Sequence, residues 1–227
     1  MALRLLYLVG VSAFAAGGVQ AAHRARLDPF GGLVLGMVSG VAGGTLRGLI
    51  LGRGPLYWTR DWVLITVITA TAVTVMVVLR HRDLPHRSLQ LLDAMGLGVV
   101  TVIGAHAAIE AGVAAPAVLI LAVLTGTAGE IVRDLLCGRS LPQLLHEEVY
   151  ALAALAGASC FLLCDRLGWS GTGPALLGTA VVFALRVTAI RFGLQLPRLG
   201  RHKAGTCRLC RSRRAPEPRS AETPATP

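Results

Sequence analysis

The chain carries little charge. Asp, Glu, Lys and Arg make up 15% of its 227 residues and hydrophobic residues make up 54%, whereas soluble domains usually contain about 25% charged residues. Several apolar runs approach the roughly 20 residues that a helix needs to cross a bilayer. This composition excludes an ordinary soluble domain and predicts an all-α, polytopic membrane protein.

Signatures of catalysis and of metal binding are also absent from the sequence. It contains no H-E-x-x-H, G-x-S-x-G or P-loop pattern, so we expect neither enzymatic activity nor a cofactor. Cys207 and Cys210 form a lone C-x-x-C motif, with His202 as the nearest further ligand type. Zinc requires about four ligands, and no metal site is therefore expected.

The positive charge is concentrated near the C-terminus. The net charge is +10, and residues 198–227 hold eight basic residues against two glutamates. Together with their prolines, this composition predicts a disordered basic tail. Such a tail next to a membrane span favours a cytoplasmic location and contact with anionic lipid, and it argues against nucleic-acid binding.

One segment of the chain occurs twice. Residues 39–47 (SGVAGGTLR) return as residues 125–133 (TGTAGEIVR), and the same offset of 86 residues superposes Gly10 on Gly96 and Gly18 on Gly104. A repeat at one fixed offset indicates two copies of one structural unit. Residues that the offset brings together are called repeat mates below.

Seven membrane-spanning helices are predicted. Their ranges are 3–22, 30–52, 62–79, 91–110, 114–136, 148–164 and 173–190. The first could instead be a cleaved signal peptide, but it matches the fourth at the repeat offset, so we expect it to be a mature helix. The repeats then cover 3–82 and 89–168, followed by a seventh helix at 173–192 and the tail at 198–227.

The distribution of arginine predicts the orientation in the membrane. Arg24, Arg26, Arg80 and the basic tail fall on one side, and the positive-inside rule makes that side cytoplasmic. The N-terminus then lies outside, in a bacterial plasma membrane. Because each repeat has three spans, the two copies enter from opposite sides, which predicts a 3+3 inverted repeat of the kind found in transporters.

Glycines interrupt the second and fifth predicted helices. Gly43 and Gly44 are adjacent, and Gly126 and Gly129 follow in the second copy. Adjacent glycines weaken a helix and permit a kink, and a kinked backbone inside a membrane is tolerated along a water-filled cavity. We expect these residues, with Thr45, to line a pore. The alternative is that they serve only close helix packing.

Ionisable side chains lie near these glycines. Arg47 and Arg133 are repeat mates near opposite membrane faces. An ionisable residue within a membrane span is a candidate functional residue, but the side chain of either arginine could simply extend to the membrane–water interface. Asp93 is expected at the same membrane depth as Arg133, and Glu110 at the same depth as Arg47. Asp93 is therefore a candidate ion-pair partner of Arg133, and Glu110 of Arg47.

Glu130 stands where the first copy has Gly44. We expect either a pore carboxylate that favours cations or a local ion pair with Arg133. Asp134 is a further charge at this end of the helix. Arg186, in the last predicted helix, is expected to reach the cytoplasmic face.

Several segments resemble the bacterial membrane proteins built from two glycine-transporter domains, which are relatives of the trimeric intracellular cation (TRIC) channels. These segments are 28–31 (DPFG), 42–47 (AGGTLR), 92–97 (LDAMGL), 133–139 (RDLLCGR), 148–151 (EVYA) and 185–191 (LRVTAIR). The resemblance implies a seven-helix subunit of a homotrimer. Each subunit would hold its own pore for monovalent cations, chiefly potassium, lined by kinked second and fifth helices.

The sequence also departs from the family pattern, which has three glycines followed by Arg-Asp in both halves. Gly48 follows Arg47 where the pattern has aspartate, and Glu130 replaces a glycine in the second half. Two other functions remain open at this point: a carrier for a small solute such as glycine, and a membrane protein that transports nothing.

Overall fold

The computed structural model describes residues 2–82, 85–138, 149–169 and 171–193, and the predicted tail lies outside them. Within these ranges the chain is helical and contains no strand. The elements are α1 (Ala2–Arg24), α2 (Pro29–Ile50), the short 3₁₀ turn η1 (Tyr57–Thr59), α3 (Trp62–His81), α4 (His86–Glu110), α5 (Ala115–Leu136), α7 (Val149–Arg166) and α8 (Gly173–Phe192).

Local chemistry explains where the helices start and stop. The carboxylate of Asp28 caps α2 by accepting a hydrogen bond from the Gly31 backbone N–H at 2.7 Å, and Pro29 occupies the first helical turn. Past the ends of α2 and α5, Gly52 and Gly138 adopt φ of 62° and 70°. Glycine favours this left-handed region after a helix, and these two glycines are repeat mates.

Among the described residues, seven helices are long and apolar enough to cross a membrane, which confirms the predicted seven-helix architecture. The largest difference is at α4, which begins at His86 rather than at the predicted residue 91. Its first turn, which includes Arg87 and Ser88, is polar. Hydropathy alone therefore does not mark this turn as part of a span.

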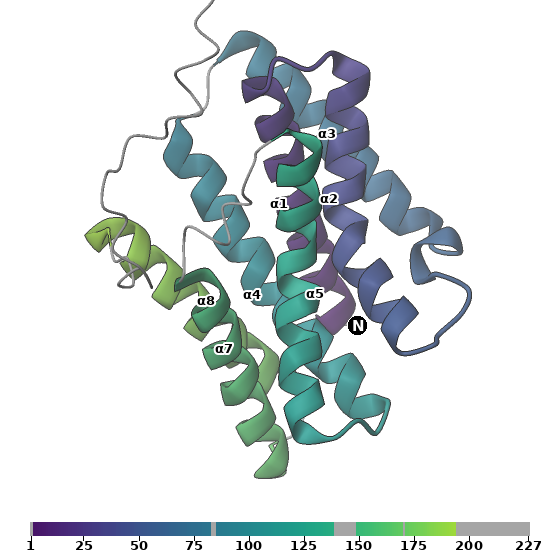
Figure 1. Cartoon of the computed structure of the whole chain (residues 1–227), viewed down its shortest axis with the longest axis vertical. Helices are drawn as coiled ribbons and strands as arrows, with labels where there is room; N and C mark the ends of the chain where they lie inside the picture. The colour runs from purple at the N-terminus through teal and green to yellow at the C-terminus, as the bar shows by residue number, and fades with distance from the viewer. Residues whose placement is uncertain (1, 83–84, 139–148, 170, 194–227) are drawn as a thin grey trace, which may run out of the picture. The chain divides into compact units, whose positions relative to one another are not determined.

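Helices α1 and α4 form the centre of the bundle (Figure 1). In each, 67% of the most apolar stretch is buried, against 22% in α3 and 28% in α8. Helix α1 packs against α2, α3 and α4, while α4 packs against α5, α7 and α8. Helix α2 lies beside α5 and runs in the opposite direction.

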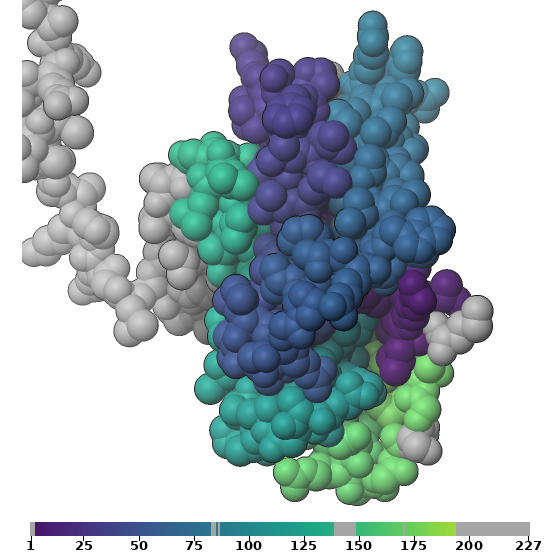
Figure 2. All heavy atoms as spheres, turned by 90° about the vertical axis from the view of Figure 1, so that its right-hand side faces the viewer, coloured from purple at the N-terminus to yellow at the C-terminus, as the bar shows by residue number. Residues whose placement is uncertain are grey.

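The connection between α2 and α3 lies on the surface, as the blue segment of Figure 2 shows. Its η1 turn nevertheless sends Tyr57 and Trp58 inward to pack with α1, α2 and α3. The indole Nε1 of Trp58 donates a hydrogen bond to Thr45 Oγ1 at 3.0 Å. This connection therefore contacts the helix that carries the repeated motif.

Candidate functional site

The repeated motif lies where α2 crosses α5. A side-chain carbon on Gly129 would lie 2.6 Å from the carbonyl oxygen of Ser39, and one on Gly43 would collide with the carbonyl oxygen of Thr125. Gly43 and Gly129 are repeat mates, as are Ser39 and Thr125, so the contact is reciprocal. Only glycine permits this approach of the two backbones.

Helices α1 and α4 meet at repeat mates in part. A side-chain carbon on Gly10 would lie 2.6 Å from Val99 and 3.3 Å from Val100, and one on Gly96 would lie 3.0 Å from Phe14. Gly10 and Gly96 are repeat mates, and so are Phe14 and Val100. The Gly10–Val100 and Gly96–Phe14 contacts therefore correspond, whereas the shorter approach of Gly10 to Val99 belongs to the first copy.

Close packing is what the structure shows for the motif glycines. Helices α2 and α5 are continuous through them, and the space beside Gly126 is filled by the hydroxyl of Thr101. Thr45 uses its hydroxyl within the bundle, donating to the carbonyl oxygen of Val41 at 2.8 Å. The kink and the pore remain predictions.

A buried charge cluster surrounds Arg133. Its guanidinium lies 2.6 Å from Asp93 Oδ1, 3.3 Å from Glu130 Oε1 and 3.3 Å from Asp134 Oδ1. All four side chains are almost completely buried. The structure therefore contains the expected Asp93–Arg133 pair and also the local Glu130–Arg133 pair.

Three other helices complete the surroundings of this cluster. Gly17 of α1 leaves room for the Asp93–Arg133 pair, because a side-chain carbon there would lie 3.1 Å from Asp93 Oδ1. Tyr150 of α7 is fully buried, and the guanidinium of Arg186 of α8 lies 4.5 Å above its ring. This stacking is a cation–π contact, and Arg186 is buried inside the bundle rather than extended away from it.

Neither Gly17 nor Tyr150 could be predicted from the sequence as a neighbour of the cluster. Neither residue belongs to the repeated motif, and Tyr150 has Leu64 as its repeat mate. The second oxygen of Glu130 and the Tyr150 hydroxyl are both buried, and the two side chains lie next to each other. Among the described residues, the buried charged side chains carry three carboxylates and two guanidinium groups in all.

Arg47 has different surroundings from its repeat mate Arg133. No ion pair is recorded for it within the part of the chain that the structure describes, and its Nη1 is buried without a hydrogen-bond partner there. Glu110 lies 3.6 Å from His106 Nδ1. The expected Arg47–Glu110 pair is therefore wrong, because His106, one turn away on the same helix, engages the carboxylate.

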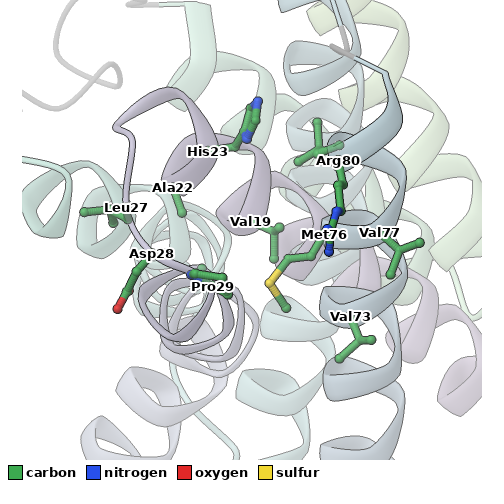
Figure 3. Close-up of a pocket in the computed structure, with 12 residues that line it drawn as sticks. Val19, Ala22, His23, Leu27, Asp28, Pro29, Val73, Met76, Val77 and Arg80 are labelled. Carbon is green, nitrogen blue, oxygen red and sulfur yellow. The ribbon is translucent and has the colours of Figure 1, made fainter.

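A cavity of about 500 Å³ lies between α1, α2 and α3 (Figure 3). Its walls are mostly apolar, with His23 and Arg80 at one end and Asp28 at another side. None of the predicted site residues lines it. The cavity is therefore separate from the α2–α5 crossing.

Comparisons with known proteins agree on one family. The family model described as glycine transporter matches residues 4–80 and again residues 90–166. The UPF0126 inner membrane protein YadS of Escherichia coli strain K12 is 36% identical over 197 residues, which is 85% of this chain and 93% of the relative. YvgT of Bacillus subtilis strain 168 is 34% identical over 202 residues, covering 87% and 96%.

Solved structures give the same result. The TRIC trimeric intracellular cation channel orthologue from Rhodobacter sphaeroides is 35% identical, with a TM-score of 0.80 over 85% of this chain and 99% of that one. A prokaryotic TRIC channel studied in 0.5 M KCl is 26% identical, with a TM-score of 0.79 over 86% and 99%.

Proposed function

Because the chain belongs to the family of membrane proteins built from two glycine-transporter domains, we propose that it is a cation channel of the bacterial inner membrane. The observation that carries this proposal is the likeness to the Rhodobacter sphaeroides orthologue, which is described as a trimeric cation channel. We propose that this chain likewise forms a homotrimer and that it transports cations. The solved structures that it resembles are described as channels and not as enzymes.

We further propose that the pore runs along the crossing of α2 and α5 in each subunit and prefers monovalent cations such as potassium. Gly43, Gly44, Thr45, Gly126 and Gly129 would line it. The reciprocal contacts support this assignment, because they point to a pseudo-two-fold axis through the crossing. Transporters place their sites near the midplane at such an axis.

The same contacts support the inverted repeat. Gly43 contacts Thr125 while Gly129 contacts Ser39, so α2 and α5 run antiparallel at the crossing. Repeat mates that run antiparallel belong to copies of opposite orientation. Combined with the arginine distribution, this supports an N-terminus outside and a C-terminus in the cytoplasm.

The charge cluster would form the cytoplasmic end of the pore. It contains the carboxyl groups of Asp93, Glu130 and Asp134 and the guanidinium groups of Arg133 and Arg186. Carboxylates that line a pore attract cations and repel anions. Glu130 directly follows Gly129 of the crossing, so it is the side chain that we expect to contact a passing ion.

Flux measurements in proteoliposomes separate this function from its two alternatives. A channel releases the potassium that is trapped inside the liposomes, and the rate of release does not saturate with external solute. A carrier for glycine instead shows saturable glycine uptake and no potassium release, and a protein that transports nothing shows neither. We expect potassium release well above that of protein-free liposomes, and its absence would refute the proposed function.

A further inference from the structure

The connection between α2 and α3 covers one end of the repeated motif. A side-chain carbon on Gly44 would collide with the ring of Tyr57. One on Gly48 would lie 3.8 Å from the side chain of Leu56. Gly44 and Gly48 are four residues apart and therefore lie on one face of α2. Because Gly44 directly follows Gly43, whose backbone meets α5 at the crossing, Tyr57 lies at the edge of the crossing.

Trp58 ties the same connection to α2. Its indole Nε1 donates a hydrogen bond to Thr45 Oγ1 at 3.0 Å, and this hydroxyl donates its own proton to the carbonyl oxygen of Val41 at 2.8 Å. A hydroxyl has one proton and two acceptor lone pairs, so Thr45 makes both bonds at once. The hydroxyl of a residue that the sequence predicts to line the pore is thus engaged by the connection.

Both ends of this connection are fixed to the bundle. Gly52, in the left-handed region at φ 62°, turns the chain at the end of α2. At the other end, the carboxylate of Asp61 accepts a hydrogen bond from the Leu64 N–H at 3.2 Å and pairs with Arg4 of α1 at 3.3 Å. Residues 53–60 between these points, called the strap below, lie on the surface of the molecule (Figure 2). The strap can therefore move while its two ends stay attached.

The equivalent place in the second copy is built differently. Glu130 is the repeat mate of Gly44, and it lies next to Tyr150, which belongs to the long helix α7. Tyr57 instead comes from a surface connection whose 3₁₀ turn has three residues. Surface segments with few buried contacts open at a lower free energy than the helices of a core. The first-copy end of the crossing is therefore the end that can open without moving a helix.

We propose that the strap closes the pore at this end, with Tyr57 as the blocking side chain and Trp58 as the residue that holds it in place. This inference rests on the proposed pore along the α2–α5 crossing, and in the proposed orientation the strap lies at the outer mouth of that pore. Opening requires Trp58 to release Thr45. The lone pair that the indole vacates then becomes available to a cation, because Thr45 keeps its proton on the Val41 carbonyl oxygen.

Potassium release from proteoliposomes tests the strap with conservative substitutions. Trp58→Phe keeps an aromatic ring but removes the N–H donor to Thr45. It should raise the rate of release about fivefold, the change expected when the closed form loses one ordinary hydrogen bond. Tyr57→Ala removes the blocking ring itself and should raise the rate at least as much. Trp62→Phe is the matched control, because the Trp62 ring is 74% exposed, and it should release potassium at the wild-type rate.

A gain of potassium flux separates closure from damage, because a disrupted fold loses flux. A trapped fluorescent dye too large for the pore should stay inside the liposomes in every variant, which excludes general leakage. Release that is unchanged or slower in both Trp58→Phe and Tyr57→Ala would overturn the strap and leave the channel in place. If the wild type and all variants match protein-free liposomes, the channel itself is refuted, and the strap has no pore to close.

Hydrogen–deuterium exchange of the purified protein tests the contact of the strap without transport. Gly44→Ala places a carbon against the Tyr57 ring and should displace the strap, so the backbone amides of residues 53–60 should exchange faster than in the wild type. Gly48→Ala, whose new carbon would lie 3.8 Å from its nearest neighbours, should exchange at the wild-type rate. In a Tyr57→Ala background, Gly44→Ala should have no further effect.

The two measurements also distinguish where a failure lies. Equal exchange of residues 53–60 in Gly44→Ala and the wild type would overturn the strap, whatever the flux. Faster exchange in Gly44→Ala together with silent liposomes would confirm the contact of Tyr57 with Gly44 but refute the channel, and with it the closing role of the strap.

Discussion

Replacing Arg133 with glutamine is expected to destabilise the bundle by about 3–5 kcal/mol, the usual cost of removing one partner from a buried ion pair. Arg133 lies within 3.3 Å of three carboxylates, and all of them are buried. Without its guanidinium, these three carboxyl groups would lose the positive charge that all of them contact. Equilibrium unfolding in detergent or mixed micelles measures the loss.

The sign of the charge provides the control. Glu130→Gln removes one of the three carboxylates and leaves the other two paired with Arg133, so it should cost much less than Arg133→Gln. Arg47→Gln removes the repeat mate, for which no ion pair is recorded in the described chain, and should also have a small effect. Equal losses for Arg133→Gln and Glu130→Gln would show that the shared contact with Arg133 does not hold the carboxylates in place.

The second large effect is expected at the α2–α5 crossing. Gly43→Ala and Gly129→Ala should each destabilise the protein by about 1–3 kcal/mol, the range for overpacked sites. In both cases the obstacle is a backbone carbonyl oxygen, of Thr125 or of Ser39, which cannot turn away as a flexible side chain can. Because the contacts are reciprocal, the two substitutions should have similar effects on the unfolding temperature.

Gly48→Ala is the control for the change from glycine to alanine itself. This residue lies on the same helix as Gly43, and its surroundings are open. Alanine in a helix is favoured over glycine by roughly 0.8–1 kcal/mol, so this variant should be neutral or more stable. If Gly43→Ala and Gly129→Ala behave like Gly48→Ala, then the close backbone approach is not required for the fold.

Much of the fold could be predicted from the sequence because the repeat restricts it. The offset of 86 residues by itself identifies the pairs of equivalent residues, including Gly43 with Gly129 and Arg47 with Arg133. Long apolar runs identify the seven helices. The Asp93–Arg133 pair could also be predicted, because Asp93 near the start of its helix and Arg133 near the end of its helix are expected on the same side of the membrane.

What could not be predicted depends on how each helix is rotated about its axis. Depth in the membrane also suggested Glu110 as a partner for Arg47, but the structure shows Glu110 with His106 on its own helix. Arg186 lies near a helix end, where an extended side chain was expected, yet the ring of Tyr150 from the neighbouring helix holds it inside. Gly17 gave no sequence signal, because its role appears only where three helices meet.

The measurement that tests the central proposal most directly is the recording of current through a planar bilayer across a potassium chloride gradient. We expect discrete currents that reverse near the potassium equilibrium potential. In Glu130→Gln the reversal should move toward zero, because one fixed negative charge is lost, while Glu110→Gln, which alters a largely exposed carboxylate, should match the wild type. Reversal near the chloride equilibrium potential, or a bilayer that stays silent, would contradict a cation channel.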